Sequence, residues 1–169
     1  MLIVGVSKSG QAAITPHLGL YATSSLEQLV EHRCSVRPLR ASEGYRDAST
    51  ALRRLGVDVD NWPVPPAGVF VVGERTVDLR SLTAMTIGHE VAHAIDCTLG
   101  GGVYRSGFDP FIRAAYAAAR AFETPYAATG LDEYLAESVR AYAGVFNHAV
   151  SPWPAANARA LADVRSHDA

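Results

Sequence analysis

The segment His89-Glu90-Val91-Ala92-His93 places two histidines and a glutamate within five consecutive residues. Residues four positions apart lie on one face of an α-helix, so the two imidazoles would point toward the same spot if this segment is helical. Glu90 would lie about 100° around the helix from His89, beside that spot. The segment therefore predicts a helix that gathers polar groups on one face.

The residues around this segment favour a helix that follows a β-hairpin. The helix is expected over about 82–99, with Ser81 or Thr83 as its N-cap and three consecutive glycines as its end. Before it, two runs rich in β-forming residues, 68–73 and 76–79, are separated by two residues and indicate a hairpin. This order of elements would place the two histidines beside a sheet.

Two neutral imidazoles at this spacing are typical zinc ligands. The segment matches H-E-x-x-H, a pattern in which the histidines bind zinc and the glutamate is the general base of a peptidase. Zinc lowers the pKa of its water ligand to about 7, so a neighbouring carboxylate can remove a proton while the metal polarises a carbonyl. The alternative is that His89 and His93 are merely polar residues on an apolar helix. The sequence favours the metal site, with Glu90 as the base.

A catalytic zinc site usually has three protein ligands and a water, so a third ligand must come from another part of the chain. Glu133 and Glu137 are four residues apart on a helix expected over about 130–146. Thr129 with Asp132 resembles a capping box, which would place Glu133 in the first turn. Two carboxylates on one face repel each other unless a cation lies beside them, and a metal would supply it. A solvated acidic helix end, favoured by the helix dipole, is the alternative.

Together these motifs resemble the zinc peptidases related to the catalytic domain of anthrax lethal factor and to the Pro-Pro endopeptidases. In that family H-E-x-x-H is followed by a helix of the type E-[FY]-[FL]-A-E, and residues 133–137 read E-Y-L-A-E. The family also carries a tyrosine seven residues before the ligand glutamate, which is Tyr126 here. The resemblance implies that Glu133 is the third zinc ligand and that Glu137 orients a ligating histidine. Tyr126 is then expected to donate to the oxyanion of the transition state.

The resemblance extends to His93-Ala94-Ile95-Asp96, which is similar to the family's H-A-x-D continuation. Asp96 would lie on the helix face of the two histidines, in an outer-shell role. The similarity covers about residues 68–147 and is weak before them. Val91-Ala92 replaces the more familiar bulky residue and glycine, at positions that need not touch the metal. The resemblance implies an α+β, zincin-like metallopeptidase domain with a small sheet and an active-site helix.

The remaining elements are expected from local patterns alone. A first strand at about 1–6 would be followed by a turn-rich stretch through Thr15-Pro16-His17. Further helices are expected over 24–31 (capped by Ser24 or Ser25), 45–55 (ending at Gly56) and 110–123, and a Pro-Trp-Pro turn and an amphipathic tail would close the chain. Nothing marks a linker, so a single domain over residues 1–169 is expected.

The composition is that of a globular chain and excludes several classes of function. Of the 169 residues 49% are hydrophobic and 19% are charged, and the formal net charge is -2. That charge leaves no basic footprint for nucleic acid, and no apolar run is long enough to span a membrane. No signal peptide is recognisable, so cytoplasmic synthesis is expected, with release from the cell by another route left open.

The cysteines and the other histidines are not expected at the metal. Cys34 and Cys97 imply no disulfide framework, although one bridge between them stays open. Cys97 lies four residues after His93, where it could be a fourth ligand, but a buried thiol is the favoured interpretation. Surface or core positions are expected for His17, His32, His148 and His167.

The sequence therefore predicts a zinc-dependent endopeptidase that cleaves peptide or protein substrates with metal-activated water. Two alternatives stay open. One is a zinc hydrolase that acts on a non-peptide amide, and the other is a catalytically silent binding or toxin-associated module that retains the site. An extended substrate is expected to pair with an edge strand drawn from residues 69–79.

Overall fold

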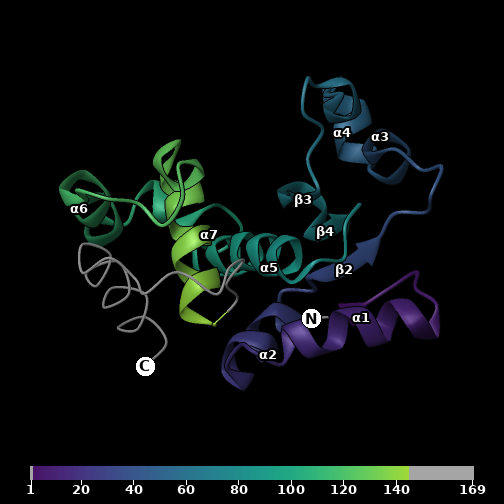
Figure 1. The fold of residues 1–169 in the computed structure, drawn as a ribbon, viewed down its shortest axis with the longest axis horizontal. Helices are drawn as coiled ribbons and strands as arrows, with labels where there is room; N and C mark the ends of the chain where they lie inside the picture. The colour runs from purple at the N-terminus through teal and green to yellow at the C-terminus, as the bar shows by residue number, and fades with distance from the viewer. Residues whose placement is uncertain (1, 145–169) are drawn as a thin grey trace.

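The fold is built around a small mixed sheet and one central helix. The computed structural model describes residues 2–144, which contain both helices and strands in an α+β arrangement (Figure 1). The strand order is β1-β2-β4-β3, in which β1, β2 and β4 are parallel and β3 is antiparallel to β4. The strands are β1 (Leu2–Ile3), β2 (Ser35–Pro38), β3 (Gly68–Val71) and β4 (Thr76–Leu79).

The predicted hairpin is confirmed, and it leaves β3 at the edge of the sheet. Phe70 on β3 lies opposite Val77 on β4, and both side chains are buried. The turn is a short 3₁₀ segment, η2 (Val72–Glu74), followed by Arg75 in the left-handed region at φ 52. Because β4 lies between β2 and β3, β3 is the member of the hairpin that has a free edge.

The helix that carries the histidines, α5 (Ala84–Leu99), lies at the centre of the molecule (Figure 1). Thr83 caps it through its side-chain oxygen, which accepts a hydrogen bond from the Thr86 N–H. The helix ends at Gly100, where the Val103 carbonyl oxygen occupies the space that a Cβ would need. The predicted helix, its Thr83 cap and its glycine end are confirmed. It packs against β3, β4, α1, α2 and α7.

A second helix, α7 (Leu131–Tyr142), packs along α5 and carries acidic residues in its first turn. The predicted capping box is wrong, because the N-cap is Gly130 and no side chain caps the helix. The Thr129 hydroxyl instead donates to the Tyr126 carbonyl oxygen at 2.7 Å. Glu133 nevertheless lies in the first turn, as predicted.

The N-terminal third differs most from the prediction. A helix, α1 (Lys8–Leu18), replaces the expected turn-rich stretch and contains Pro16 near its end. Ser7 caps this helix, and Ile14 is fully buried in the core, so burial of an apolar face outweighs the one backbone bond that the proline removes. The helix α2 (Thr23–Glu31) confirms the next prediction, although its N-cap is Ala22 and not a serine.

The other predicted helices form but are shorter or interrupted. The helix expected over 45–55 is broken at Ser49, whose extended backbone (φ -112, ψ 122) starts a new helix, and it ends as predicted at Gly56. The helix expected over about 130–146 ends earlier, at Tyr142, before Gly144 adopts a φ of 81, and residues 145 and 146 lie outside the described residues. The Pro-Trp-Pro turn and the tail lie outside the described residues. The remaining helices and turns are α3 (Tyr45–Ala48), α4 (Thr50–Leu55), η1 (Val59–Asn61), η3 (Arg105–Gly107), α6 (Pro110–Ala118) and η4 (Tyr126–Ala128).

The core surrounds α5, since Ile87, Val91 and Ala92 are all fully buried. Cys34 and Cys97 are also buried in this core and form no bridge. Within residues 2–144 no helix has the length and apolar character needed to cross a bilayer.

Candidate metal centre

Three ligand atoms from α5 and α7 converge on one point. His89 Nε2 lies 3.1 Å from His93 Nε2 and 3.0 Å from Glu133 Oε2, and His93 Nε2 lies 3.4 Å from the same oxygen. For four ligands at roughly 2.0 to 2.1 Å around a tetrahedral zinc ion, neighbouring ligand atoms are about 3.3 Å apart. The three separations fit such a site. In the part of the chain that the structure describes, His89, His93 and Glu133 form the cluster that could hold a metal ion. His17 and His32 do not belong to this cluster.

The hydrogen bond of His89 to Glu137 uses Nδ1, so Nε2 is the ring atom that can bind a metal. Its Nδ1 lies 2.8 Å from Glu137 Oε1. A carboxylate oxygen accepts, so Nδ1 carries a proton, and once a metal displaces the second proton of the ring, Nε2 presents its lone pair to the convergence point. This is the arrangement in which a second carboxylate fixes the orientation of a ligating histidine. The structure therefore places Glu137 against His89, while the roles of these two residues at a metal stay predictions.

Glu137 has no capacity left to bind a metal itself. One of its oxygens accepts from His89 Nδ1 and from Arg140 Nε at 3.0 Å. The other accepts from Arg140 Nη2 and from the Thr124 hydroxyl, each at 2.8 Å. Four donors occupy the lone pairs of the carboxylate. Although burial alone would raise the pKa of Glu137, the hydrogen bonds and charges of His89 and Arg140 lower it to about 2.

Negative charge accumulates around the three ligand atoms. Burial disfavours the charged imidazolium of His89, but the carboxylates of Glu133 and Glu137 outweigh burial and raise its pKa to about 10. The pKa of Glu133 is lowered, because its hydrogen bonds with His89 and His93 outweigh its burial. Three acceptor atoms this close repel each other unless a proton or a cation lies among them. The site therefore has the electrostatic character that favours a cation.

Glu90 lies beside the ligands in a confined position. Glu90 is only 8% exposed. Burial raises the pKa of its carboxyl, against the opposing effects of His89, His93 and a hydrogen bond from the Phe70 backbone. Its stem packs on Gly68 of β3, where a Cβ would come within 2.6 Å of Glu90 Cγ. The edge strand and Glu90 are thus in direct contact.

Tyr126 lies at the open side of the site. Its ring centroid is 5.6 Å from that of His89, and the residue is 54% exposed. Burial of the hydroxyl and the Glu133 carboxylate, with which it shares a hydrogen bond, raise the pKa of the phenol. The hydroxyl is therefore protonated at neutral pH and able to donate.

Asp96 is buried but contacts neither histidine. Its two oxygens accept from the backbone N–H and the hydroxyl of Ser106, at 2.9 and 2.6 Å. No hydrogen bond joins it to His89 or His93 among the described residues. The outer-shell role expected from the sequence stays a prediction, and the groups that contact Asp96 directly belong to Ser106.

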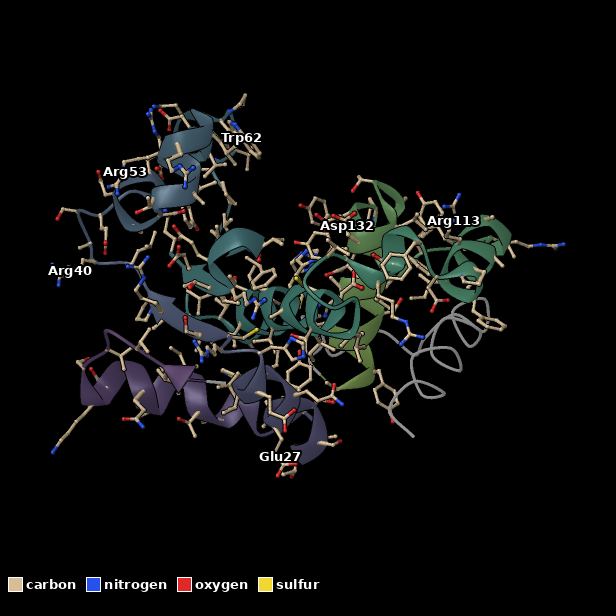
Figure 2. All side chains as sticks on the ribbon, turned by 180° about the vertical axis from the view of Figure 1, so that it is seen from behind. Glu27, Arg40, Arg53, Trp62, Arg113 and Asp132 are labelled. Atoms are coloured by element: carbon tan, nitrogen blue, oxygen red, sulfur yellow. The ribbon has the colours of Figure 1, made fainter. Side chains whose placement is uncertain are left out.

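The ligand residues line a cleft of about 180 Å³. One wall comes from the connection before β3 and from β3 itself, and the opposite wall comes from η4 and the start of α7. Trp62 and Asp132, which both line the cleft, lie on these two sides in Figure 2. The free edge of β3 therefore borders the site.

Several residues of the site were not identified from the sequence. Arg140, which is 1% exposed and pairs with Glu137, gives a signal only through its i,i+3 spacing on the helix. Gly68, the first residue of β3, gives only a weak signal, because a glycine marks the close approach of another group mainly inside a strand. Thr124 and Tyr104 lie in irregular segments, and the sequence gives no signal for them.

Comparison with models of known protein families gives no match to this chain, and comparison with curated proteins gives no match either. The resemblance to the lethal factor and Pro-Pro endopeptidase family therefore stays a prediction that rests on the motif residues.

Proposed function

We propose that this chain is a zinc-dependent endopeptidase with a zincin-like active site. The observation that supports the proposal most strongly is the convergence of His89 Nε2, His93 Nε2 and Glu133 Oε2 within 3.4 Å of one another. The donor set of two imidazoles and a carboxylate is that of catalytic zinc sites with an open fourth position.

The other residues have defined roles in this proposal. A zinc ion held by His89, His93 and Glu133 would supply an acidified water and a polarised carbonyl. Glu90 removes a proton from the attacking water and delivers it to the leaving amine, since it lies beside His89 in the same cleft. The Tyr126 hydroxyl donates to the oxygen that becomes negative in the transition state.

The position of β3 favours a peptide substrate over a small amide. An edge strand offers unpaired N–H and C=O groups to an extended peptide. Gly68, Val69 and Phe70 of this strand line the cleft together with Glu90. A peptide paired with β3 would therefore pass close to the base and to the three ligands. A hydrolase of small amides has no need of such an edge.

A cleavage screen tests the proposal and separates it from the alternatives. The purified chain and its Glu90→Gln variant are incubated with a mixture of peptides, with and without a chelator, and the new N-termini are sequenced. Cleavage by the wild type that is lost with the chelator and in Glu90→Gln supports an endopeptidase. A zinc-loaded chain that cleaves no peptide contradicts it. Turnover of non-peptide amides by that chain would then identify the first alternative, and inertness toward both would identify a silent binding module.

A further inference from the structure

The two ligand histidines are held in different ways. The His89 ring is fixed by a hydrogen bond from Nδ1 to Glu137. The Nδ1 atom of His93 is buried and has no hydrogen-bond partner within residues 2–144. The side chain of His93 is 7% exposed, so its ring orientation depends on the groups packed around it.

Tyr104 is the aromatic residue packed on His93. The two ring centroids are 5.5 Å apart with the planes tilted by 47°. The Tyr104 ring also lies near the ring of Phe70 on β3, with the two centroids 6.4 Å apart. Tyr104 therefore fills the space between one ligand and the edge strand, and it lines the cleft.

The loop that carries Tyr104 contacts α5 on both sides of Tyr104. It begins at Gly100, where only a glycine fits against the Val103 carbonyl. Beyond Tyr104, Ser106 donates both its N–H and its hydroxyl to Asp96, and both residues are fully buried. Arg105 pairs with Asp109 at 2.8 Å, and Asp109 caps α6. The backbone on both sides of Tyr104 is thus fixed relative to the helix that carries His93.

We propose that Tyr104 is a positioning residue that holds the His93 imidazole in its ligating orientation, and that Asp96 acts on the metal site through Ser106 and Tyr104. This inference rests on the proposed function, because it concerns the same zinc site. It assigns the buried Asp96 carboxylate a route to the metal that does not require contact with either histidine. It also explains how the His93 ring is held although its Nδ1 has no hydrogen-bonded carboxylate within residues 2–144.

The test measures zinc affinity by competition with a chromophoric chelator, for the full chain and four variants. Tyr104→Phe keeps the ring and removes the hydroxyl, so its affinity should stay near that of the wild type. Tyr104→Ala should weaken zinc binding by about 10 to 100 fold, the usual effect of losing a group that orients a ligand. Ser106→Ala should weaken it in the same direction. The double variant of Tyr104→Ala and Ser106→Ala should bind as Tyr104→Ala does, since residues acting through one another are not additive.

Two further measurements separate positioning from general folding. The visible spectrum of the Co²⁺-loaded protein should change in Tyr104→Ala and should be restored in Tyr104→Phe, because that spectrum follows the geometry of the ligands. Ser49→Ala removes another fully buried serine hydroxyl, the cap of α4, and should leave zinc affinity unchanged. If Tyr104→Ala does not fold, Tyr104→Leu keeps an apolar group at the position and serves in its place.

The outcomes distinguish this inference from the proposed function. A wild-type chain that binds no zinc overturns both. A wild-type chain that binds zinc, with equal affinity and an equal Co²⁺ spectrum in Tyr104→Ala, overturns the positioning role alone. Additive losses in the double variant overturn the route from Asp96 through Ser106.

Discussion

Glu137 is predicted to orient His89 and not to bind zinc, and two variants separate this role from its role in folding. Its carboxylate accepts from His89, Arg140 and Thr124. Glu137→Ala removes the acceptor for His89 and also the carboxylate that pairs with Arg140, a residue only 1% exposed. The double variant of Glu137→Leu and Arg140→Met removes both charges of the pair and still leaves His89 without its acceptor.

The expected magnitudes differ between folding and metal binding. Removing one partner of a buried ion pair costs about 3 to 5 kcal/mol of folding free energy, whereas replacing the whole pair with apolar side chains is about neutral. Losing the group that orients a metal ligand weakens affinity by about 10 to 100 fold. This corresponds to about 1.4 to 2.7 kcal/mol, since a tenfold change is about 1.4 kcal/mol.

Urea unfolding of the metal-free protein and competition with a chelator measure the two effects separately. Glu137→Ala should lose both folding free energy and zinc affinity. The double variant should regain stability while its zinc affinity stays weak. Glu133→Ala, the comparison variant, should lose zinc outright because it removes a ligand. If zinc affinity returned with stability in the double variant, Glu137 would serve only to balance the charge of Arg140. If Glu137→Ala lost more zinc than Glu133→Ala, the two roles would be exchanged.

His89→Ala and His93→Ala should each abolish stoichiometric zinc in metal analysis, because two remaining ligands leave the ion largely to water; full zinc content in either variant contradicts the ligand set. Tyr126→Phe should keep zinc and apparent substrate affinity while kcat falls on the order of 10² to 10³, as for loss of one oxyanion donor. An unchanged kcat would leave that hydroxyl without a catalytic role. Gly68→Ala should displace Glu90, because the added Cβ would come within 2.6 Å of Glu90 Cγ; activity should drop with zinc retained, and a crystal structure with Glu90 unmoved would contradict the reasoning.

The parts of the fold that were predicted correctly depend on local signals. The helix α5 has a threonine cap, an apolar pattern and a glycine run at its end, and all three act within a few residues. The hairpin of β3 and β4 is likewise defined by β-forming runs and a short turn. Because H-E-x-x-H lies in this locally defined region, the convergence of His89 and His93 could be predicted with it.

The errors arise where distant contacts decide the local conformation. The Thr15-Pro16-His17 stretch looks like a turn, but burial of Ile14 and Leu18 stabilises a helix that includes Pro16. The capping box at Thr129 and Asp132 is plausible from residue types, yet Thr129 ends the turn η4, where its hydroxyl donates to the Tyr126 carbonyl oxygen, and the N-cap of the helix is the next residue, Gly130. In both cases several conformations satisfy the local sequence, and packing selects one.

The residues that support the site could not be predicted from sequence patterns, because distant contacts bring them together. The sequence suggested that a metal would relieve the repulsion between Glu133 and Glu137. The structure shows that a cation of the chain itself, the buried guanidinium of Arg140, lies beside Glu137. Its role depends on burial, which a charge pattern does not reveal. Tyr104 reaches His93 only because the loop from Gly100 to Ser106 folds back on α5.

X-ray absorption at the zinc edge of the loaded protein measures the ligands of the metal directly. Zinc held by His89, His93 and Glu133 should show two imidazole nitrogens and oxygen ligands at roughly 2.0 to 2.1 Å, with no sulfur. A sulfur ligand at roughly 2.3 Å would place a cysteine such as Cys97 on the metal, and a spectrum without imidazole would place the metal elsewhere. Either result would contradict the proposed centre.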